Sequence, residues 1–270
     1  MSIQIIYKTG LFKKKSSNLV LFVDENFNIT GLKKLISNKE YSFIEDLLAI
    51  NDKKKKIIAY DLNSRRKIIL ISIKKKITTS EAEGLGAKFY DIFKDIKQNN
   101  FDINSETAKN TLKNFVGYFL HGLKLKSYIF DKYKSKKKKK NLIIKILGKN
   151  IPSLKHQIKF KAIENGTFFA RDLVSEPGNI LHPDEYAKRL NSLKKIGLKV
   201  NIYDEKKLKK LGMNTLLGVG QGSIRGSYLV TMEWKGKKDD SKPLAFVGKG
   251  VCFDTGGISL KPAKFMEDMT

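Results

Sequence analysis

Two lysines and an aspartate stand among glycines near the end of this 270-residue sequence. The apolar run Leu244–Val247 leads into Gly-Lys-Gly around Lys249, a second apolar triplet precedes Asp254, and Lys261 follows a Gly-Gly pair. Charged side chains flanked by strand-like sequence need a partner, a metal or an open cleft, and glycine lets a ligand approach the backbone closely. Two interpretations stay open: a ligand site, or a Lys249–Asp254 ion pair at a strand end.

Other segments that could carry chemistry are less specific. The stretch from Gly218 to Ser223 has the wrong glycine spacing for a dinucleotide loop and precedes a strand-like run, so a turn is expected. Cys252 is the single cysteine and has no nearby histidine, which favours a buried, unreactive thiol. The three histidines are scattered, no His-Glu-x-x-His pair exists, and His121 lies among apolar neighbours, so we interpret it as structural.

The first half alternates strand-like and helix-like segments, which predicts an α/β domain over residues 1–150. Short apolar runs predict five strands, at Ile3–Tyr7, Leu19–Val23, Ile57–Tyr60, Ile68–Ile73 and Leu142–Leu147. A helix is expected between Thr79 and Ile96, opened by Ser/Thr–Glu signals. Apolar residues at helical spacing predict another helix over 108–123, with Ser105 as its N-cap.

Gly148 and Pro152 mark a break, after which a second α/β unit is expected over residues 151–270. A long helix is predicted from Ser153 to Val174, and another from Pro183, where proline occupies the first turn. The remaining apolar runs predict further strands at Lys199–Tyr203, Leu216–Val219, Tyr228–Glu233 and Leu244–Val247, with a short helix ending at Gly212.

Composition sets the broad class. Lys+Arg number 54 against 27 Asp+Glu, a formal net charge of +27, and 41% of residues are hydrophobic, enough for a packed core. The basic residues are nearly all lysines in short runs, whereas readout of nucleic-acid bases favours arginine. Solvated surface lysines are therefore the first interpretation, with non-specific DNA or other polyanion binding as the alternative. A single cysteine and no secretory or membrane-spanning pattern predict a cytoplasmic protein.

The segment around Lys249 closely resembles the leucyl (cytosol) aminopeptidases. The resemblance extends over most of the chain from about residue 80. It is carried by Val247–Gly250, Phe253–Pro262, Arg171–Asn179, Leu211–Met213 and Val219–Ser223, and more loosely by Leu125–Tyr128 and Phe130–Lys134.

The resemblance implies an N-terminal macro-like α/β domain followed by an α/β metallopeptidase catalytic domain, assembled as a hexamer. Members of the family release N-terminal residues from peptides with two divalent metals, commonly Mn²⁺, Zn²⁺ or Mg²⁺. Carried over by position, Lys249 is a metal ligand and Asp254 bridges both metals. Lys261 contacts the substrate carbonyl, and Met269 lines the pocket for the first side chain of the peptide.

The sequence departs from the family pattern in one respect. The family's further acidic metal ligands and its bicarbonate-binding arginine have no counterpart up to Thr270, so the catalytic domain is expected to be incomplete and the 270 residues alone inactive. The alternative function is a basic nucleic-acid-binding accessory protein without peptidase activity, because some members of the family bind DNA.

Overall fold

The computed structural model describes residues 2–8, 18–50, 54–109, 112–136, 141–236 and 242–268. The chain forms two compact units, Met1–Phe168 and Phe169–Thr270. The division falls inside helix α4 (Leu154–Ser175), whereas the sequence predicted a break near residue 150.

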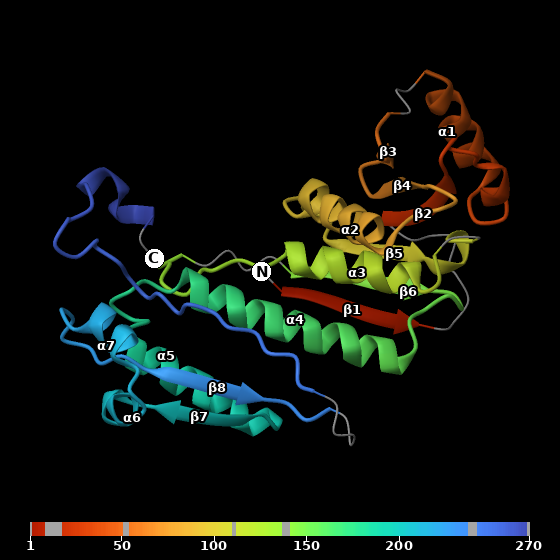
Figure 1. Ribbon diagram of the computed structural model, residues 1–270. Helices are drawn as coiled ribbons and strands as arrows, with labels where there is room; N and C mark the ends of the chain where they lie inside the picture. Colours follow the sequence, from red (N-terminus) through yellow and green to blue (C-terminus); the bar gives the residue numbers. More distant parts are fainter. Residues whose placement is uncertain are drawn as a thin grey trace. The chain divides into compact units, whose positions relative to one another are not determined.

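A six-stranded sheet organises the first unit, in the order β1-β6-β5-β2-β4-β3 (Figure 1). All neighbouring strands are parallel except β3, which runs antiparallel to β4. The strands are β1 (Ser2–Lys8), β2 (Asn18–Asp24), β3 (Ile57–Asn63), β4 (Arg66–Ile73), β5 (Asn100–Asn104) and β6 (Asn141–Leu147). The five strands predicted from apolar runs are confirmed. β5, with only two apolar residues, was not anticipated.

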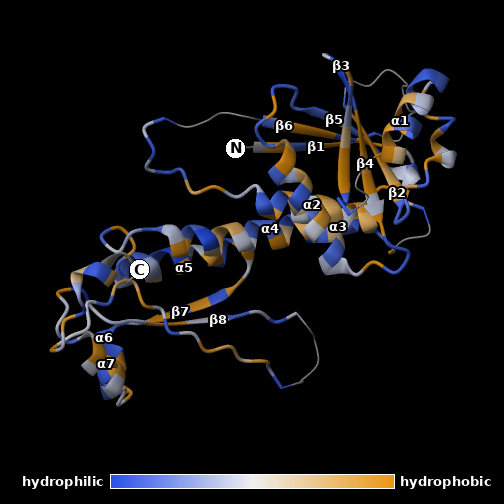
Figure 2. Cartoon of the chain, turned by 90° about the horizontal axis from the view of Figure 1, so that it is seen from above, coloured by the Kyte–Doolittle hydropathy of each residue, from blue (hydrophilic) through white to orange (hydrophobic). Residues whose placement is uncertain are grey.

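Helices cover the two faces of this sheet. On one face α2 (Thr79–Phe93) and α3 (Phe115–Lys126) pack over β2, β5 and β6, and on the other α1 (Asn38–Ile50) packs over β2, β3 and β4. Because β2 and β4 are covered on both sides, nearly all their residues are buried. This explains why they are continuous apolar runs rather than alternating ones (Figure 2).

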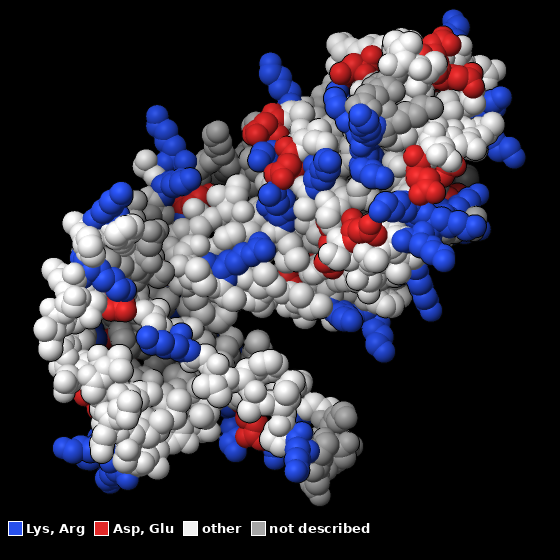
Figure 3. Space-filling view, turned by 45° about the horizontal axis from the view of Figure 1, so that its top comes forward, with Lys and Arg blue, Asp and Glu red and all other residues white. Residues whose placement is uncertain are grey.

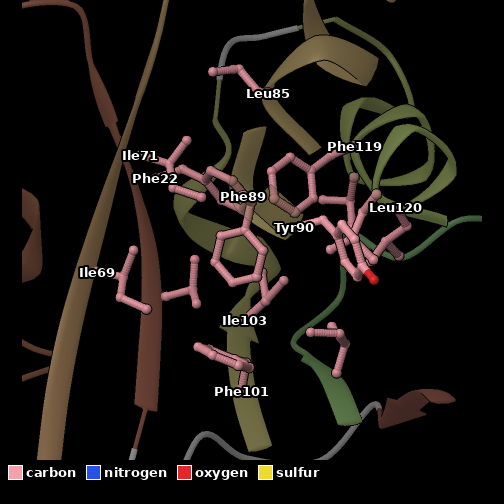
Figure 4. Packing of buried hydrophobic residues seen from close by; sticks show 14 of the residues in the cluster. Phe22, Ile69, Ile71, Leu85, Phe89, Tyr90, Phe101, Ile103, Phe119 and Leu120 are labelled. Carbon is pink, nitrogen blue, oxygen red and sulfur yellow. The ribbon is translucent and has the colours of Figure 1, made fainter. Parts of the chain in front are cut away.

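Aromatic rings fill the core beneath α2 and α3. Phe119 meets Phe22 and Phe89 edge to face, with ring centroids 5.6 and 5.7 Å apart (Figure 4). Such edge-to-face pairs add to the free energy gained from burying the rings. This cluster holds the two helices on the sheet.

The predicted start of the helix over 108–123 is wrong. Ser105 is not its N-cap: it begins a 3₁₀ turn, Ser105–Thr107, and its buried hydroxyl donates to the Leu147 carbonyl at 2.8 Å. The helix begins only at Phe115, after Asn114 in the left-handed conformation (φ 64°). By contrast, α2 begins close to the expected place, with a capping box between Thr78 and Glu81.

Helix α4 is attached to the first unit by its N-terminal half. His121 Nδ1 of α3 lies 3.3 Å from Glu164 Oε1 of α4, and the His121 ring stacks on Phe160 with centroids 4.9 Å apart. Both His121 and Glu164 are buried. The histidine is thus part of the packing between α3 and α4, in agreement with its structural interpretation.

The second unit contains α5 (Pro183–Asn191), α6 (Glu205–Lys210), α7 (Asn214–Gly220) and a two-stranded antiparallel sheet of β7 (Lys199–Tyr203) and β8 (Leu229–Glu233). Two predicted strands are wrong here. Leu216–Val219 lies in α7, and Leu244–Val247 has no regular structure. Among the described residues no strand pairs with Leu244–Val247, and Val247 is fully exposed. Within the ranges given above, no helix has the length and apolarity needed to cross a bilayer.

Candidate functional site

The residues from Asp254 to Lys261 form a compact loop that returns on itself. Asp254 Oδ1 accepts a hydrogen bond from the Gly256 amide at 2.9 Å, and Lys261 Nζ donates to Asp254 Oδ2 and to the Asp254 carbonyl, each at 3.1 Å. The Lys261 amide closes the loop by donating to the Thr255 carbonyl at 2.9 Å. The carboxylate and the ammonium singled out by the sequence therefore lie in direct contact.

Two glycines make this reversal possible. Gly256 and Gly257 adopt φ of 110° and 95°, in the left-handed region that other residues rarely occupy. A Cβ on Gly256 would lie 2.3 Å from the Ser259 carbonyl oxygen. The Gly-Gly pair is thus required for Lys261 to reach Asp254.

The electrostatics of the loop favour ionised Asp254. The Gly256 amide and then the Lys261 ammonium lower the pKa of its carboxyl below the ordinary range, and the charge of Lys249 adds a smaller effect. The sequence interpretation that paired Lys249 with Asp254 is wrong, because Lys261 forms the ion pair with Asp254. The side chains of Lys261 and Asp254 are 41% and 49% exposed, so the pair is open to solvent.

The segment before Asp254 runs against the start of α5. A Cβ on Gly178 would lie 2.9 Å from the Phe253 Cβ, and one on Gly250 would lie 3.2 Å from Tyr186 Cε1. Cys252 is half-buried rather than buried. Its burial, followed by the negative charge of Asp184, raises the pKa of its thiol, which agrees with an unreactive cysteine.

A polar cluster at the start of α5 was not anticipated from the sequence. Asp184 pairs with His182, which caps the helix, and Asp184 Oδ2 lies 3.3 Å from Arg225 Nη1. The only signal in the sequence was the His-Pro-Asp order at a helix start. Arg225 comes from the distant turn after α7, and nothing in the sequence links it to Asp184.

The described residues do not by themselves form a metal centre. Of the positions that the family resemblance assigns to metals, only Lys249 and Asp254 are present, and both oxygens of Asp254 already accept hydrogen bonds. Across the ranges that the structure describes, no three His, Cys, Asp or Glu side chains converge. Met269 lies outside the described residues. A dication needs four or more donor atoms, so these residues do not fit the two-metal centre without further ligands.

The part of the sequence that contains this loop is similar to known proteins. Residues 168–270 match the catalytic domain of the cytosol aminopeptidase family. The probable cytosol aminopeptidase of Caulobacter vibrioides is 51% identical over 154 residues, which cover 55% of this chain and 31% of that protein. The matched region thus spans about a third of the length of that relative.

Solved structures show the same fold. A mutant of tomato leucine aminopeptidase superposes with a TM-score of 0.73 at 22% identity, covering 94% of this chain and 55% of that one. The bottromycin maturation enzyme BotP in complex with Mn gives a TM-score of 0.66 at 20% identity, covering 92% and 51%. The α/β fold and the resemblance to leucyl aminopeptidases are confirmed, and residues 168–270 match the catalytic domain of the cytosol aminopeptidase family.

Proposed function

We propose that this chain supplies part of a metal-dependent aminopeptidase that removes N-terminal residues from peptides. The observation that carries the proposal is the family match over residues 168–270, which contain the Asp254–Lys261 loop. The Mn-bound relative of the same fold supports a divalent metal. In this proposal Lys249 and Asp254 are metal ligands, together with acidic ligands beyond the described residues.

Lys261 is proposed to bind the carbonyl oxygen of the substrate. An ammonium group has three N–H donors, and Asp254 receives two of them. The third is available for a substrate oxygen. Asp254 holds the ammonium in place, and a fixed positive charge stabilises negative charge that develops on the carbonyl oxygen.

The alternative of a nucleic-acid-binding protein is not favoured. Acidic side chains lie among the lysines and arginines on the face in Figure 3. Several lysines are also paired with carboxylates, such as Lys67 with Asp61 and Lys126 with Asp91. A DNA-binding surface would gather unpaired basic groups on one face.

The test is a chimera that joins residues 1–270 to the remaining C-terminal part of the Caulobacter relative. We expect hydrolysis of leucine p-nitroanilide with Mn²⁺. The Lys261→Ala chimera should lose roughly 10²–10³-fold in kcat, as when an oxyanion donor is removed, and retain its metal. Lys264→Ala is the matched control, because Lys264 is a lysine three positions further along the chain whose ammonium lies over the Phe265 ring. A folded, Mn²⁺-loaded chimera without hydrolysis would contradict the proposal, as would unchanged kcat in Lys261→Ala.

A further inference from the structure

The segment that contains Lys249 and Asp254 contacts the rest of the second unit over a short stretch. None of the described strands pairs with residues 242–253, so the hydrogen bonds of a sheet do not hold this segment. Within residues 242–260 every residue is exposed except Cys252, which is half-buried. Cys252 therefore marks the place where the segment lies against the body of the unit.

Two elements form this contact: the turn between α4 and α5, and α5 itself. In the turn, a Cβ on Gly178 would lie 2.9 Å from the Phe253 Cβ and 3.2 Å from the Cys252 carbonyl oxygen. In α5, the Tyr186 ring lies against Gly250, with 3.2 Å between its Cε1 and a Cβ built on that glycine. Residues 250–253 are therefore the stretch that the turn and α5 hold.

A buried ion pair joins the turn to α5. Glu176 stands directly before the turn, and its side chain is 1% exposed. Arg189 of α5 donates to this carboxylate, with 3.1 Å between its Nη1 and Glu176 Oε1. The same guanidinium donates through Nε to Glu185 Oε1 at 3.0 Å, which orients the arginine on its own helix. The rigid fork of donors in arginine allows one side chain to contact both carboxylates.

This ion pair fixes an arrangement of the two elements. The cost of taking two charges out of water offsets much of their attraction, whereas losing one partner of a buried pair is strongly destabilising. The turn is also closed locally, because the Pro177 carbonyl accepts hydrogen bonds from the Ile180 and Leu181 amides, each at 2.9 Å. A shift of this turn along α5 would therefore separate Glu176 from Arg189.

We propose that Glu176 is a positioning residue for Lys249 and Asp254, the two metal ligands of the function proposed above, on which this inference rests. Through Arg189 its carboxylate fixes the turn on α5, and these two elements hold residues 250–253. Those four residues are the ones that separate Lys249 from Asp254 in the sequence. Glu176 thus acts on the spacing of the two ligands through the backbone, rather than by binding the metal or the substrate itself.

The first experiment uses Cys252, the single cysteine of the sequence, as a probe in the 270-residue chain. The rate of its alkylation by iodoacetamide measures how often this half-buried segment leaves its contact. Glu176→Gln should raise the rate at least about fivefold, because it removes the charge that holds Arg189. Glu185→Gln is the matched control: it removes the other carboxylate of the same arginine, which lies within α5, and should change the rate by less than about twofold.

The outcomes of this experiment need neither metal nor activity. Hydrogen exchange of the β7 and β8 amides shows whether the second unit of each variant is folded. In folded variants, an unchanged rate in Glu176→Gln would overturn the proposal, and so would an equal increase in Glu185→Gln. Should Glu176→Gln unfold the unit, Glu176→Asp decides instead. It keeps the charge but withdraws the carboxylate from Arg189 by one methylene, and should still raise the rate above that of the control.

The second experiment separates positioning from a merely structural role in the chimera described above. Glu176→Gln should raise the Mn²⁺ concentration that gives half-maximal hydrolysis by roughly 10–100-fold, as when a group that orients metal ligands is lost. The KM for leucine p-nitroanilide at saturating Mn²⁺ should stay within about twofold, because Glu176 does not contact the substrate. Glu185→Gln should leave both values unchanged.

The failure of this inference and that of the proposed function give different results. An active chimera whose Mn²⁺ requirement is the same with and without Glu176→Gln would overturn the positioning role. An unsubstituted chimera without hydrolysis would overturn the proposed function, and with it the metal role of Lys249 and Asp254. The alkylation rates would then still decide whether Glu176 holds the segment between them.

Discussion

The carboxylate of Asp254 is held by one backbone amide and one ammonium, both within its own loop. This arrangement satisfies the aspartate without any distant residue. It also keeps the carboxylate ionised, because each hydrogen bond stabilises the charged form. At the scale of single residues, the loop thus holds its charged groups in position before any ligand binds.

The first prediction concerns the pKa of Asp254. Lys261→Ala should raise this pKa toward the ordinary value of about 3.9. It should stay below that value, because the Gly256 amide, the largest cause of the lowering, remains. The measurement is an NMR titration of the side-chain carboxyl carbon. Lys264→Ala should leave the curve unchanged, and an Asp254 pKa that does not move in Lys261→Ala would contradict the hydrogen bond seen here.

The pH dependence of the loop follows from the direction of this shift. A carboxyl whose pKa is lower in the folded state stabilises that state above its unfolded pKa. This contribution is lost as the pH falls through the folded value. The Asp254 interactions should therefore be fully present at neutral pH and disappear in acid below about pH 4.

At the scale of elements, glycines set the distance between α2 and α3. A Cβ on Gly86 of α2 would lie 1.8 Å from the Phe119 carbonyl oxygen of α3, and one on Gly122 of α3 would lie 2.0 Å from the Glu83 carbonyl oxygen. Both contacts are with backbone, which cannot rotate away as a side chain can. The close approach of these helices over the aromatic core therefore depends on both glycines.

The second prediction compares two glycines of α2, one in contact with α3 and one facing open space. Gly86→Ala should destabilise the first unit by at least about 1–3 kcal/mol through overpacking. Gly84→Ala is the matched control, because no atom lies within 4 Å of its Cβ position. It should stabilise α2 by about 0.5–1 kcal/mol, the ordinary gain of alanine in a helix. The free energy of unfolding of the first unit is measured by hydrogen exchange of the buried β2 amides in urea. Equal effects of the two substitutions would contradict the packing.

At the scale of the whole molecule, the Asp254–Lys261 loop lacks the other ligands that a two-metal centre requires. One carboxylate and one amine cannot offset the repulsion between two dications. The loop instead neutralises Asp254 with Lys261.

The third prediction is that the 270-residue chain alone neither binds Mn²⁺ or Zn²⁺ tightly nor hydrolyses leucine amide. Calorimetric titration with each metal and an amide-hydrolysis assay measure this directly. The chimera described above is the positive control, because it adds the C-terminal part of the relative. Two stoichiometric metal sites with turnover in the 270-residue chain would show that its own residues complete the centre.

The sequence alone determined the elements whose signals are local. β2 and β4 could be predicted because both their faces are buried, so apolar residues fill nearly all of Leu19–Val23 and Ile68–Ile73. The starts of α2 and α5 could be predicted from the Ser/Thr–Glu signals at Thr79–Glu81 and from Pro183, although Thr78 rather than Thr79 caps α2. The Gly-rich segment around Asp254 is equally local, and it carries most of the resemblance to the cytosol aminopeptidases.

Only the tertiary structure decided the rest, because those features depend on partners distant in sequence. Short apolar runs suit a helix or a strand, and Leu216–Val219 is helical while Leu244–Val247 pairs with no described strand. Lys261 rather than Lys249 pairs with Asp254, since the Gly256–Gly257 reversal brings back the residue seven positions later. Spacing identifies the residues that can react, but the path of the backbone determines which of them meet.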